Sequence, residues 1–145
     1  MYDAVMALFP KTDIAVLSAA VADFRPEMAA DQKIKKNPDN DTFTIKLVKT
    51  EDILKSVGKV RTDNQTVVGF ALETENGLEN AKKKLHTKNI DLIVLNEMNE
   101  SGVGFKTKTN KVSIITKDDK VTEFELKPKN EVALDVLEAI YQYIN

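Results

Sequence analysis

The sequence predicts an α/β fold with a three-layer, Rossmann-like and mainly parallel sheet, a β-hairpin flap and a C-terminal antiparallel hairpin. Three observations lead to this prediction. Apolar runs without alternation, typical of strands covered on both faces, occupy residues 13–24, 65–72 and 90–98. Segments with helical spacing alternate with these runs, which is the signature of a parallel sheet. After residue 110 the pattern changes to a hairpin and one amphipathic helix.

Length and composition exclude several classes of protein. A chain of 145 residues is long enough for a sizeable core, and we expect residues 1–145 to form a single domain. The formal net charge is -2, so no basic excess is present to drive binding to nucleic acid or to a membrane. The absence of cysteine excludes a disulfide scaffold and a thiolate nucleophile. No apolar run approaches the ~20 residues of a membrane helix, so we expect a cytoplasmic protein.

The first half of the chain is expected to hold a helix, a strand and the flap. Residues 2–9 have helical apolar spacing, and Pro10 ends this helix. The run at 13–24 follows as the first strand. Residues 33–50 consist of two extended arms around the turn formers at 37–41, which predicts a β-hairpin; we call residues 33–50 the flap.

The second half is expected to alternate helices and strands before it ends in antiparallel structure. Residues 51–60 are predicted to form a short helix. Residues 73–89 form a second helix, acidic in its first turn and basic in its last, which matches the helix dipole. Residues 111–126, which we call the late hairpin, precede a closing helix at 129–144. That helix is expected to direct one apolar set inward: Val132, Val136, Leu137, Ile140 and Ile144.

Three loops follow the predicted parallel strands, where open α/β sheets bind their ligands. They are Ala20–Arg25, Gly69–Glu75 and Asn96–Phe105. Each carries a polar side chain directly after its apolar run: Asp23, Glu73 with Thr74, and Asn96. We expect these loops to converge at one edge of the sheet.

The flap carries the densest cationic cluster, formed by Lys33, Lys35 and Lys36. In an extended arm Lys33 and Lys35 share one face, and Lys36 lies on the other. Mobile lysines that close over a triphosphate would neutralise its charge and exclude water from the reaction. A solvated edge strand, protected from unwanted pairing by its lysines, explains the same run without a ligand.

Lys84 and Lys88 are i, i+4 neighbours on the predicted helix 73–89. Such a like-charge pair costs a few tenths of a kcal/mol unless an anion lies between its members, which suggests a phosphate site. A solvated last turn, favoured by the helix dipole, is the alternative.

Asp23 follows small apolar residues that let a ligand approach the backbone, so its carboxylate could accept a ribose hydroxyl or a base amino group. A cap or turn role is the alternative for Asp23. His86, the only histidine, is expected at the surface, and no metal site is predicted around it. Glu73 and Glu75 could hold Mg²⁺, although acidic residues at a helix start need no further reason.

Together these segments resemble the phosphopantothenoylcysteine synthetase (phosphopantothenate–cysteine ligase) domain family of bacterial coenzyme A biosynthesis flavoproteins. The resemblance covers nearly the whole chain in order. The matching motifs are SAAVADFRP (18–26), KIKK (33–36), LVKTEDIL (47–54), VVGFALETEN (67–76), DLIVLNE (91–97), GF (104–105), NKV (110–112) and EVA (131–133).

The resemblance implies a ligase that joins 4'-phosphopantothenate to cysteine through a CTP-derived acyl-cytidylate, with Mg²⁺ sharing the stabilisation of phosphate charge. It implies that Lys33 is the catalytic flap lysine and also contacts the nucleotide. The other nucleotide-binding positions that it implies are Ala19, Ala20, Asp23, Asp52, Ile53, Phe70, Lys84 and Lys88. It further implies a homodimer joined through the flap and the late hairpin, and FMN only where a decarboxylase domain lies upstream.

The chain also departs from the family pattern. Thr50-Glu51 stands where the family usually has Asn-Pro, Leu72 replaces a smaller residue, and Phe24 replaces Tyr or Trp. The family begins with a strand, a glycine-rich turn and an asparagine-bearing segment, and the sequence starts after them. We therefore expect this chain to bind nucleotide weakly and to turn over poorly by itself.

Two other functions compete with the ligase. A non-catalytic α/β nucleotide-binding or dimerisation module is favoured by the missing glycine-rich loop, since Gly102 and Gly104 give only G-x-G-F. An NAD-dependent Rossmann enzyme is disfavoured because no G-x-G-x-x-G follows a first strand. The motifs leave the choice between CTP and ATP open.

Overall fold

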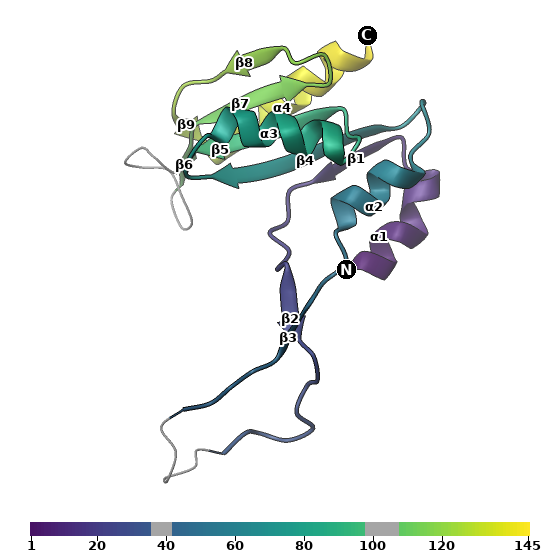
Figure 1. Cartoon of the computed structure of the whole chain (residues 1–145). Coiled ribbons are helices and arrows are strands. Elements are labelled where there is room, and N and C mark those ends of the chain that lie inside the picture. The colour runs from purple at the N-terminus through teal and green to yellow at the C-terminus, as the bar shows by residue number, and fades with distance from the viewer. Residues whose placement is uncertain (36–41, 98–107) are drawn as a thin grey trace. The chain divides into compact units, whose positions relative to one another are not determined.

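A computed structural model describes residues 1–35, 42–97 and 108–145 (Figure 1). The chain divides into two compact units. We call Met1–Ala19 together with Ile53–Asn145 the core unit, and Ala20–Asp52 the arm unit. The predicted turn at 37–41 and most of the loop Asn96–Phe105, with Gly102 and Gly104, lie outside the described residues, as does Lys36.

The core unit is built on a five-stranded sheet in the order β1-β4-β5-β7-β8. β1 is parallel to β4 and β4 to β5, whereas β5, β7 and β8 are antiparallel to one another. The strands are β1 (Ile14–Leu17), β4 (Thr66–Glu73), β5 (Leu92–Glu97), β7 (Val112–Thr116) and β8 (Val121–Glu123). This confirms the predicted α/β class, its parallel core and the late hairpin.

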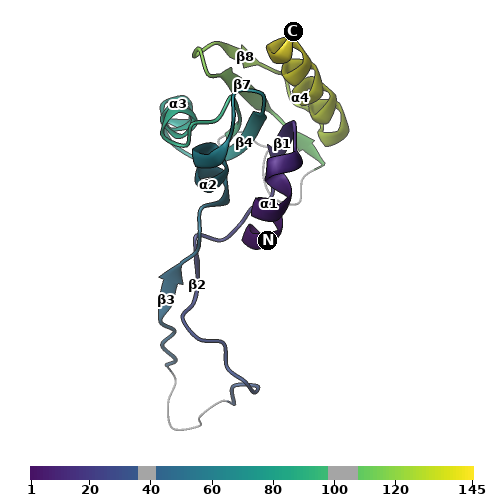
Figure 2. The same cartoon turned by 90° about the vertical axis from the view of Figure 1, so that its right-hand side faces the viewer.

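Helices cover both faces of this sheet, as Figure 2 shows. One core cluster joins α1, α2 and α3 to side chains such as Val67, Ala71 and Ile93, and the other joins α4 to Val68 and Val94. The alternation of neighbouring strand residues between the two clusters follows from the pleat. The helices are α1 (Tyr2–Leu8), a 3₁₀ turn (Phe9–Lys11), α2 (Ile53–Val60), α3 (Gly77–Thr87) and α4 (Lys129–Ile144), and the short strands β6 (Thr109–Asn110) and β9 (Lys127–Pro128) pair with each other. In the described part of the chain no helix is long and apolar enough to cross a membrane.

The arm unit is a hairpin whose paired strands are β2 (Phe24–Pro26) and β3 (Leu47–Lys49). A backbone hydrogen bond from Glu27 N to Lys46 O (3.0 Å) extends the ladder by one step. An exposed ion pair joins the side chains of the same two residues at 2.8 Å. A hairpin is therefore present in this region, as predicted. Its second strand, Leu47–Lys49, lies in the flap, but its first strand is Phe24–Pro26 rather than Lys33–Lys35.

One predicted boundary and one predicted burial pattern differ from the structure. The first strand ends at Leu17 rather than at residue 24, and residues 18–23 are exposed. Five of these six residues are small or polar, so they bring little apolar surface and low strand propensity. In α4, Val132, Val136 and Ile140 are buried as predicted, but Leu137 and Ile144 are exposed.

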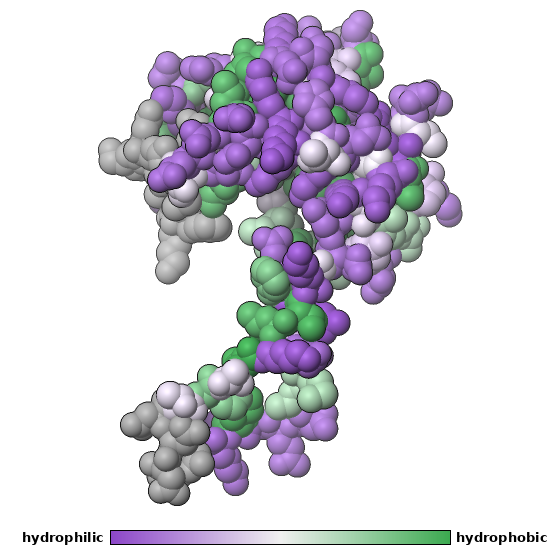
Figure 3. All heavy atoms as spheres, viewed as in Figure 1, coloured by the Kyte–Doolittle hydropathy of each residue, from purple (hydrophilic) through white to green (hydrophobic). Residues whose placement is uncertain are grey.

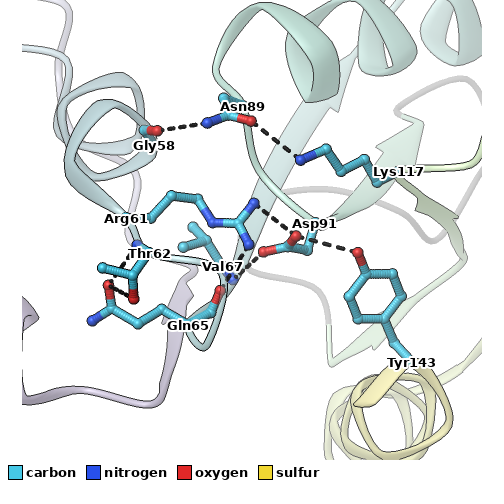
Figure 4. Close-up of polar contacts among 9 residues, drawn as sticks. All are labelled: Gly58, Arg61, Thr62, Gln65, Val67, Asn89, Asp91, Lys117 and Tyr143. Atoms are coloured by element: carbon cyan, nitrogen blue, oxygen red, sulfur yellow. Dashed lines mark hydrogen bonds and ion pairs between the residues drawn. The ribbon is translucent and has the colours of Figure 1, made fainter. Parts of the chain in front are cut away.

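A buried polar cluster ties the amino ends of β4 and β5 to α2 and α4 (Figure 4). The Asp91 carboxylate forms an ion pair with Arg61 (Oδ1 to Nη1, 2.8 Å), and both side chains are at most 10% exposed. Its second oxygen accepts the Val67 N–H (2.8 Å), and the Tyr143 hydroxyl donates to Oδ1 (3.2 Å). Arg61 also donates to the Gln65 carbonyl at 2.9 Å. This cluster compensates the Asp91 charge, because a buried charge must be paired and hydrogen-bonded.

Gly58 allows α2 to contact the chain directly after α3. A Cβ atom added at Gly58 would lie 1.8 Å from the Lys88 carbonyl oxygen, so only glycine fits there. Asn89 then donates to the Gly58 carbonyl (2.9 Å) and accepts from Lys117 (3.2 Å), as Figure 4 shows. This packing fixes the C-terminal end of α3, and with it the helix that carries Lys84.

Candidate functional site

The carboxyl end of β4 and one side of α3 form a polar cluster, which we call the Glu73 cluster. Glu73 is the last residue of β4, and its side chain is only 13% exposed. Its Oε1 pairs with the Lys84 Nζ at 2.5 Å, and its Oε2 accepts from the Asn80 Nδ2 at 3.3 Å. Asn80 also donates to the Glu75 carbonyl at 3.1 Å.

The local sequence explains why these side chains meet. Asn76 adopts the left-handed conformation (φ 50°) at the N-cap, where Asn is tolerated, and its carbonyl accepts the Asn80 N–H at 3.0 Å. Asn80 and Lys84 are i, i+4 neighbours, so they project from the same side of α3. Ala81 and Leu85 are buried beside them, which turns this side toward β4.

The structure gives the predicted lysine pair a different setting. Lys84 has a carboxylate partner from β4, so the cost of its proximity to Lys88 is offset by Glu73 without a bound anion. Lys88 is the C-cap residue of α3 and donates its backbone N–H to the Lys84 carbonyl at 3.0 Å. The sequence analysis missed the Glu73–Lys84 pair because its members lie 11 positions apart.

Phe70 lies on the other face of the sheet. Strand alternation places it with Val68, which belongs to the α4 cluster, whereas Ala71 belongs to the α3 cluster. Its ring is partly exposed. A ligand could therefore contact both Phe70 and Lys84 only by lying across the carboxyl edge of β4.

The arm unit brings together two of the predicted nucleotide-contact segments. The Thr50 N–H donates to the Asp23 carbonyl at 2.9 Å, and the Thr50 hydroxyl donates to the Ala22 carbonyl at 2.5 Å. These bonds hold the exposed segment Ala20–Asp23 against Thr50, which lies two residues before Asp52 in the sequence. Thr50 stands where the family usually has Asn, and its hydroxyl keeps the two segments joined.

The other predicted residues differ in accessibility. Ala19 belongs to the core unit and Lys33 to the arm unit, and both are exposed. Ile53 begins α2 with its side chain buried in the core, so its backbone is the part that a ligand could contact. His86 is exposed and pairs with Asp119 at 3.0 Å, as expected for a surface residue.

Comparisons with known proteins show what the chain is similar to. The sequence profile of the family "DNA/pantothenate metabolism flavoprotein C-terminal domain" matches residues 1–144. The chain is 44% identical over 145 residues to a "Cysteine/Cysteine sulfinic acid decarboxylase" from an unknown prokaryotic organism. This match covers all of this chain and 40% of that protein. It is 40% identical over 140 residues to the "Coenzyme A biosynthesis bifunctional protein CoaBC" of Bacillus subtilis, covering 97% of this chain and 34% of that protein.

A solved structure shows the same fold. The crystal structure of the C-terminal domain of a CoaBC protein superposes with a TM-score of 0.74 at 36% identity, over 99% of this chain and 62% of that chain. The chain spans less than half the length of these two curated relatives.

Proposed function

We propose a function for this chain from the fact that it belongs to the DNA/pantothenate metabolism flavoprotein C-terminal domain family. The chain contributes to a phosphopantothenate–cysteine ligase, which joins 4'-phosphopantothenate to cysteine in coenzyme A biosynthesis. The single observation that carries this proposal is the junction of Ala20–Asp23 with the turn before Asp52, made by Thr50. It brings together two segments that match the family's nucleotide-contact motifs.

The reaction proceeds in two steps. A carboxylate oxygen of 4'-phosphopantothenate attacks the α-phosphorus of CTP, so that pyrophosphate leaves and an acyl-cytidylate forms. The cysteine amine then attacks the acyl carbon, CMP leaves, and the amide nitrogen loses a proton to water. Lys33 would stabilise the negative charge that develops at the α-phosphate, as a fixed cation does in phosphoryl chemistry.

The remaining residues would bind the nucleotide. Lys84 and Lys88 would contact phosphate oxygens, and Phe70 would pack against the base. Asp23 would accept a hydrogen bond from the ribose or the base amino group. The backbone at 19–20 and 52–53 would also contact the nucleotide.

The described residues offer no metal site of their own, because no group of three His, Asp or Glu side chains is placed to hold an ion. Glu73 is engaged by Lys84 and Asn80. Mg²⁺ usually keeps several waters and binds through substrate phosphates. We therefore assign Mg²⁺ to the triphosphate of CTP and derive no step through it. FMN would be needed only if a decarboxylase domain is present upstream.

We also propose that the chain forms only part of the ligase domain, because the core unit leaves apolar side chains exposed on one face of its sheet. On the α4 face of the sheet, Ile14 and Val16 of β1 are exposed, and so is Phe70 of β4. α4 adds a second exposed stripe: Leu134, Leu137, Tyr141 and Ile144. This stripe lies on the flank of α4 that turns toward β4, because the other flank lines a cavity with β7 and β8.

The edge of β1 supports the same conclusion. Strands of parallel sheets are normally covered on both faces, and exposed edges are normally protected by charge or proline. β1 pairs on one side only and contains Ile, Ala, Val and Leu. A strand beside β1 and a helix beside α4 would complete the domain, and the CoaBC domain structure has chain to spare for both.

The arm unit supports a homodimer. Figure 3 shows apolar residues at the surface of the arm unit. The exposed apolar side chains of this unit include Phe24, Met28, Ile34, Phe43, Ile45 and Leu47. Such a surface is typical of an interaction site. We propose that the arm unit and the late hairpin pair with a second copy. We also propose that the protein is cytoplasmic.

Pyrophosphate release tests the ligase. The chain, joined to the unmatched remainder of the solved CoaBC C-terminal domain, is incubated with CTP, 4'-phosphopantothenate and cysteine. Release that requires the pantothenate carboxylate supports the proposal, and release should be much weaker from the chain alone. CTP binding without any pyrophosphate release would favour the non-catalytic nucleotide-binding module. Carbon dioxide release from cysteine, without amide formation, would instead favour the activity named for the decarboxylase relative.

A further inference from the structure

Glu73 is a half-buried carboxylate at the edge of the sheet where the ligand is expected. It accepts from two α3 side chains, Lys84 at 2.5 Å and Asn80 at 3.3 Å. Exposed ion pairs hold their side chains weakly, because solvent screens them and the long side chains lose entropy. The Glu73 side chain is only 13% exposed and the Lys84 side chain 43% exposed, so solvent screens this pair less than a pair between two exposed side chains.

This contact decides where the Lys84 ammonium lies. A lysine has a flexible four-carbon stem, and repulsion from Lys88 would favour conformations of Lys84 that point into solvent. Glu73 instead draws the ammonium to the carboxyl end of β4. An ammonium has three donors. One is directed to Glu73, which leaves others for phosphate oxygens at this edge.

We propose that Glu73 is a positioning residue that fixes Lys84 for the nucleotide phosphates, with Asn80 holding the carboxylate in place. This inference rests on the proposed function, in which Lys84 contacts phosphate. The inference predicts that removal of Glu73 weakens CTP binding, whereas the charge of Glu73 alone predicts the opposite change. Removal of a carboxylate from an anion site should tighten anion binding if Glu73 acts only through its charge. If Glu73 positions Lys84, its removal should weaken binding.

The experiment compares calorimetric CTP binding by the full 145-residue chain and by its variants at Glu73, Glu75, Lys84 and Lys33. Glu73→Ala should weaken CTP binding about tenfold. Glu73→Gln, which keeps an oxygen acceptor for Lys84, should recover at least part of this loss. Glu75→Ala is the matched control, because it removes the same charge two residues away from an exposed side chain, and it should leave binding unchanged or tighten it slightly. In a chain that carries Lys84→Ala, Glu73→Ala should have no further effect.

Two outcomes separate the inference from the proposed function. If Lys84→Ala weakens CTP binding while Glu73→Ala tightens it or leaves it unchanged, the positioning role is wrong and the ligase proposal stands. If neither Lys84→Ala nor Lys33→Ala changes CTP binding, the proposed function itself is wrong.

A second measurement needs no detectable CTP binding. Amine acylation followed by mass spectrometry gives the labelling rate of each lysine in the folded chain. A Lys84 held by Glu73 should label several-fold more slowly than Lys82 or Lys83, and Glu73→Ala should remove this protection. Equal rates for Lys84 in the parent chain and in Glu73→Ala would overturn the inference.

Discussion

Replacement of Arg61 by methionine should destabilise the core unit strongly. The substitution keeps most of the side-chain volume but leaves the Asp91 carboxylate, 3% exposed, without its cation. Removal of one partner from a buried ion pair costs about 3–5 kcal/mol. Asp91 would keep its hydrogen bonds from Val67 (2.8 Å) and Tyr143 (3.2 Å), so we expect a loss near the lower end, about 3 kcal/mol. This is a large part of the ~5–15 kcal/mol that stabilises a typical domain.

Urea denaturation followed by circular dichroism measures this loss. The double variant Arg61→Met with Asp91→Asn should recover about 1 kcal/mol or more, because a neutral amide oxygen can still accept the Val67 N–H and no charge remains buried. Asp119→Asn, which removes an exposed pair with His86, is the control and should change the unfolding free energy by less than about 0.5 kcal/mol. A loss below about 1 kcal/mol for Arg61→Met, with an unchanged denaturant slope, would refute the reasoning.

Three further variants test the packing and the polar cluster. Gly58→Ala should cost more than the ~1–3 kcal/mol of ordinary overpacking, because its Cβ would meet the Lys88 backbone oxygen at 1.8 Å. Gly69→Ala should cost less, because its closest contacts are the movable ends of Leu54 and Ile90, and thermal melts should rank the two variants in that order. Burial, and then the neighbouring Asp91 carboxylate, raise the pKa of Tyr143 above its ordinary value of 10.0. The contribution of Tyr143 to stability is therefore complete below pH 10 and is lost as pH rises through the higher pKa of the folded state. Above about pH 10, the melting temperature should consequently fall less steeply in Tyr143→Phe than in the parent chain. An identical alkaline slope in both proteins would contradict this account.

Much of the fold could be predicted because each element has its own period. The buried strands β4 and β5, the helices α2 to α4 and the late hairpin follow the apolar spacing of their residues. The end of β1 could not be read in this way. Its apolar run continues through small residues, whereas the strand ends where pairing with β4 ends, at Leu17 opposite Gly69. β4 itself continues to Glu73, so the small and polar residues after Leu17, rather than the length of the partner strand, set this boundary.

The candidate site was predictable only in part. Asp23, Lys33 and Lys84 stand out as polar residues in motifs, but their partners are distant in sequence. Thr50 holds the Ala22 and Asp23 carbonyls, and no local pattern announces such a contact. The same holds for Glu73, whose acidic character near a helix start had a simpler explanation in the helix dipole. Contacts between a strand end and a helix face depend on packing, and sequence periodicity carries no information about them.

Calorimetric titration of the folded chain with CTP and with ATP, beside Lys33→Ala, tests the central claim most directly. A ligase fragment should bind CTP more tightly than ATP, and Lys33→Ala should weaken CTP binding about tenfold. Lys49→Ala removes the same charge from the arm unit and should have little effect. If the folded chain shows no CTP binding, or if Lys33→Ala and Lys49→Ala weaken it equally, then Lys33 and its neighbours do not form the nucleotide site proposed for this chain.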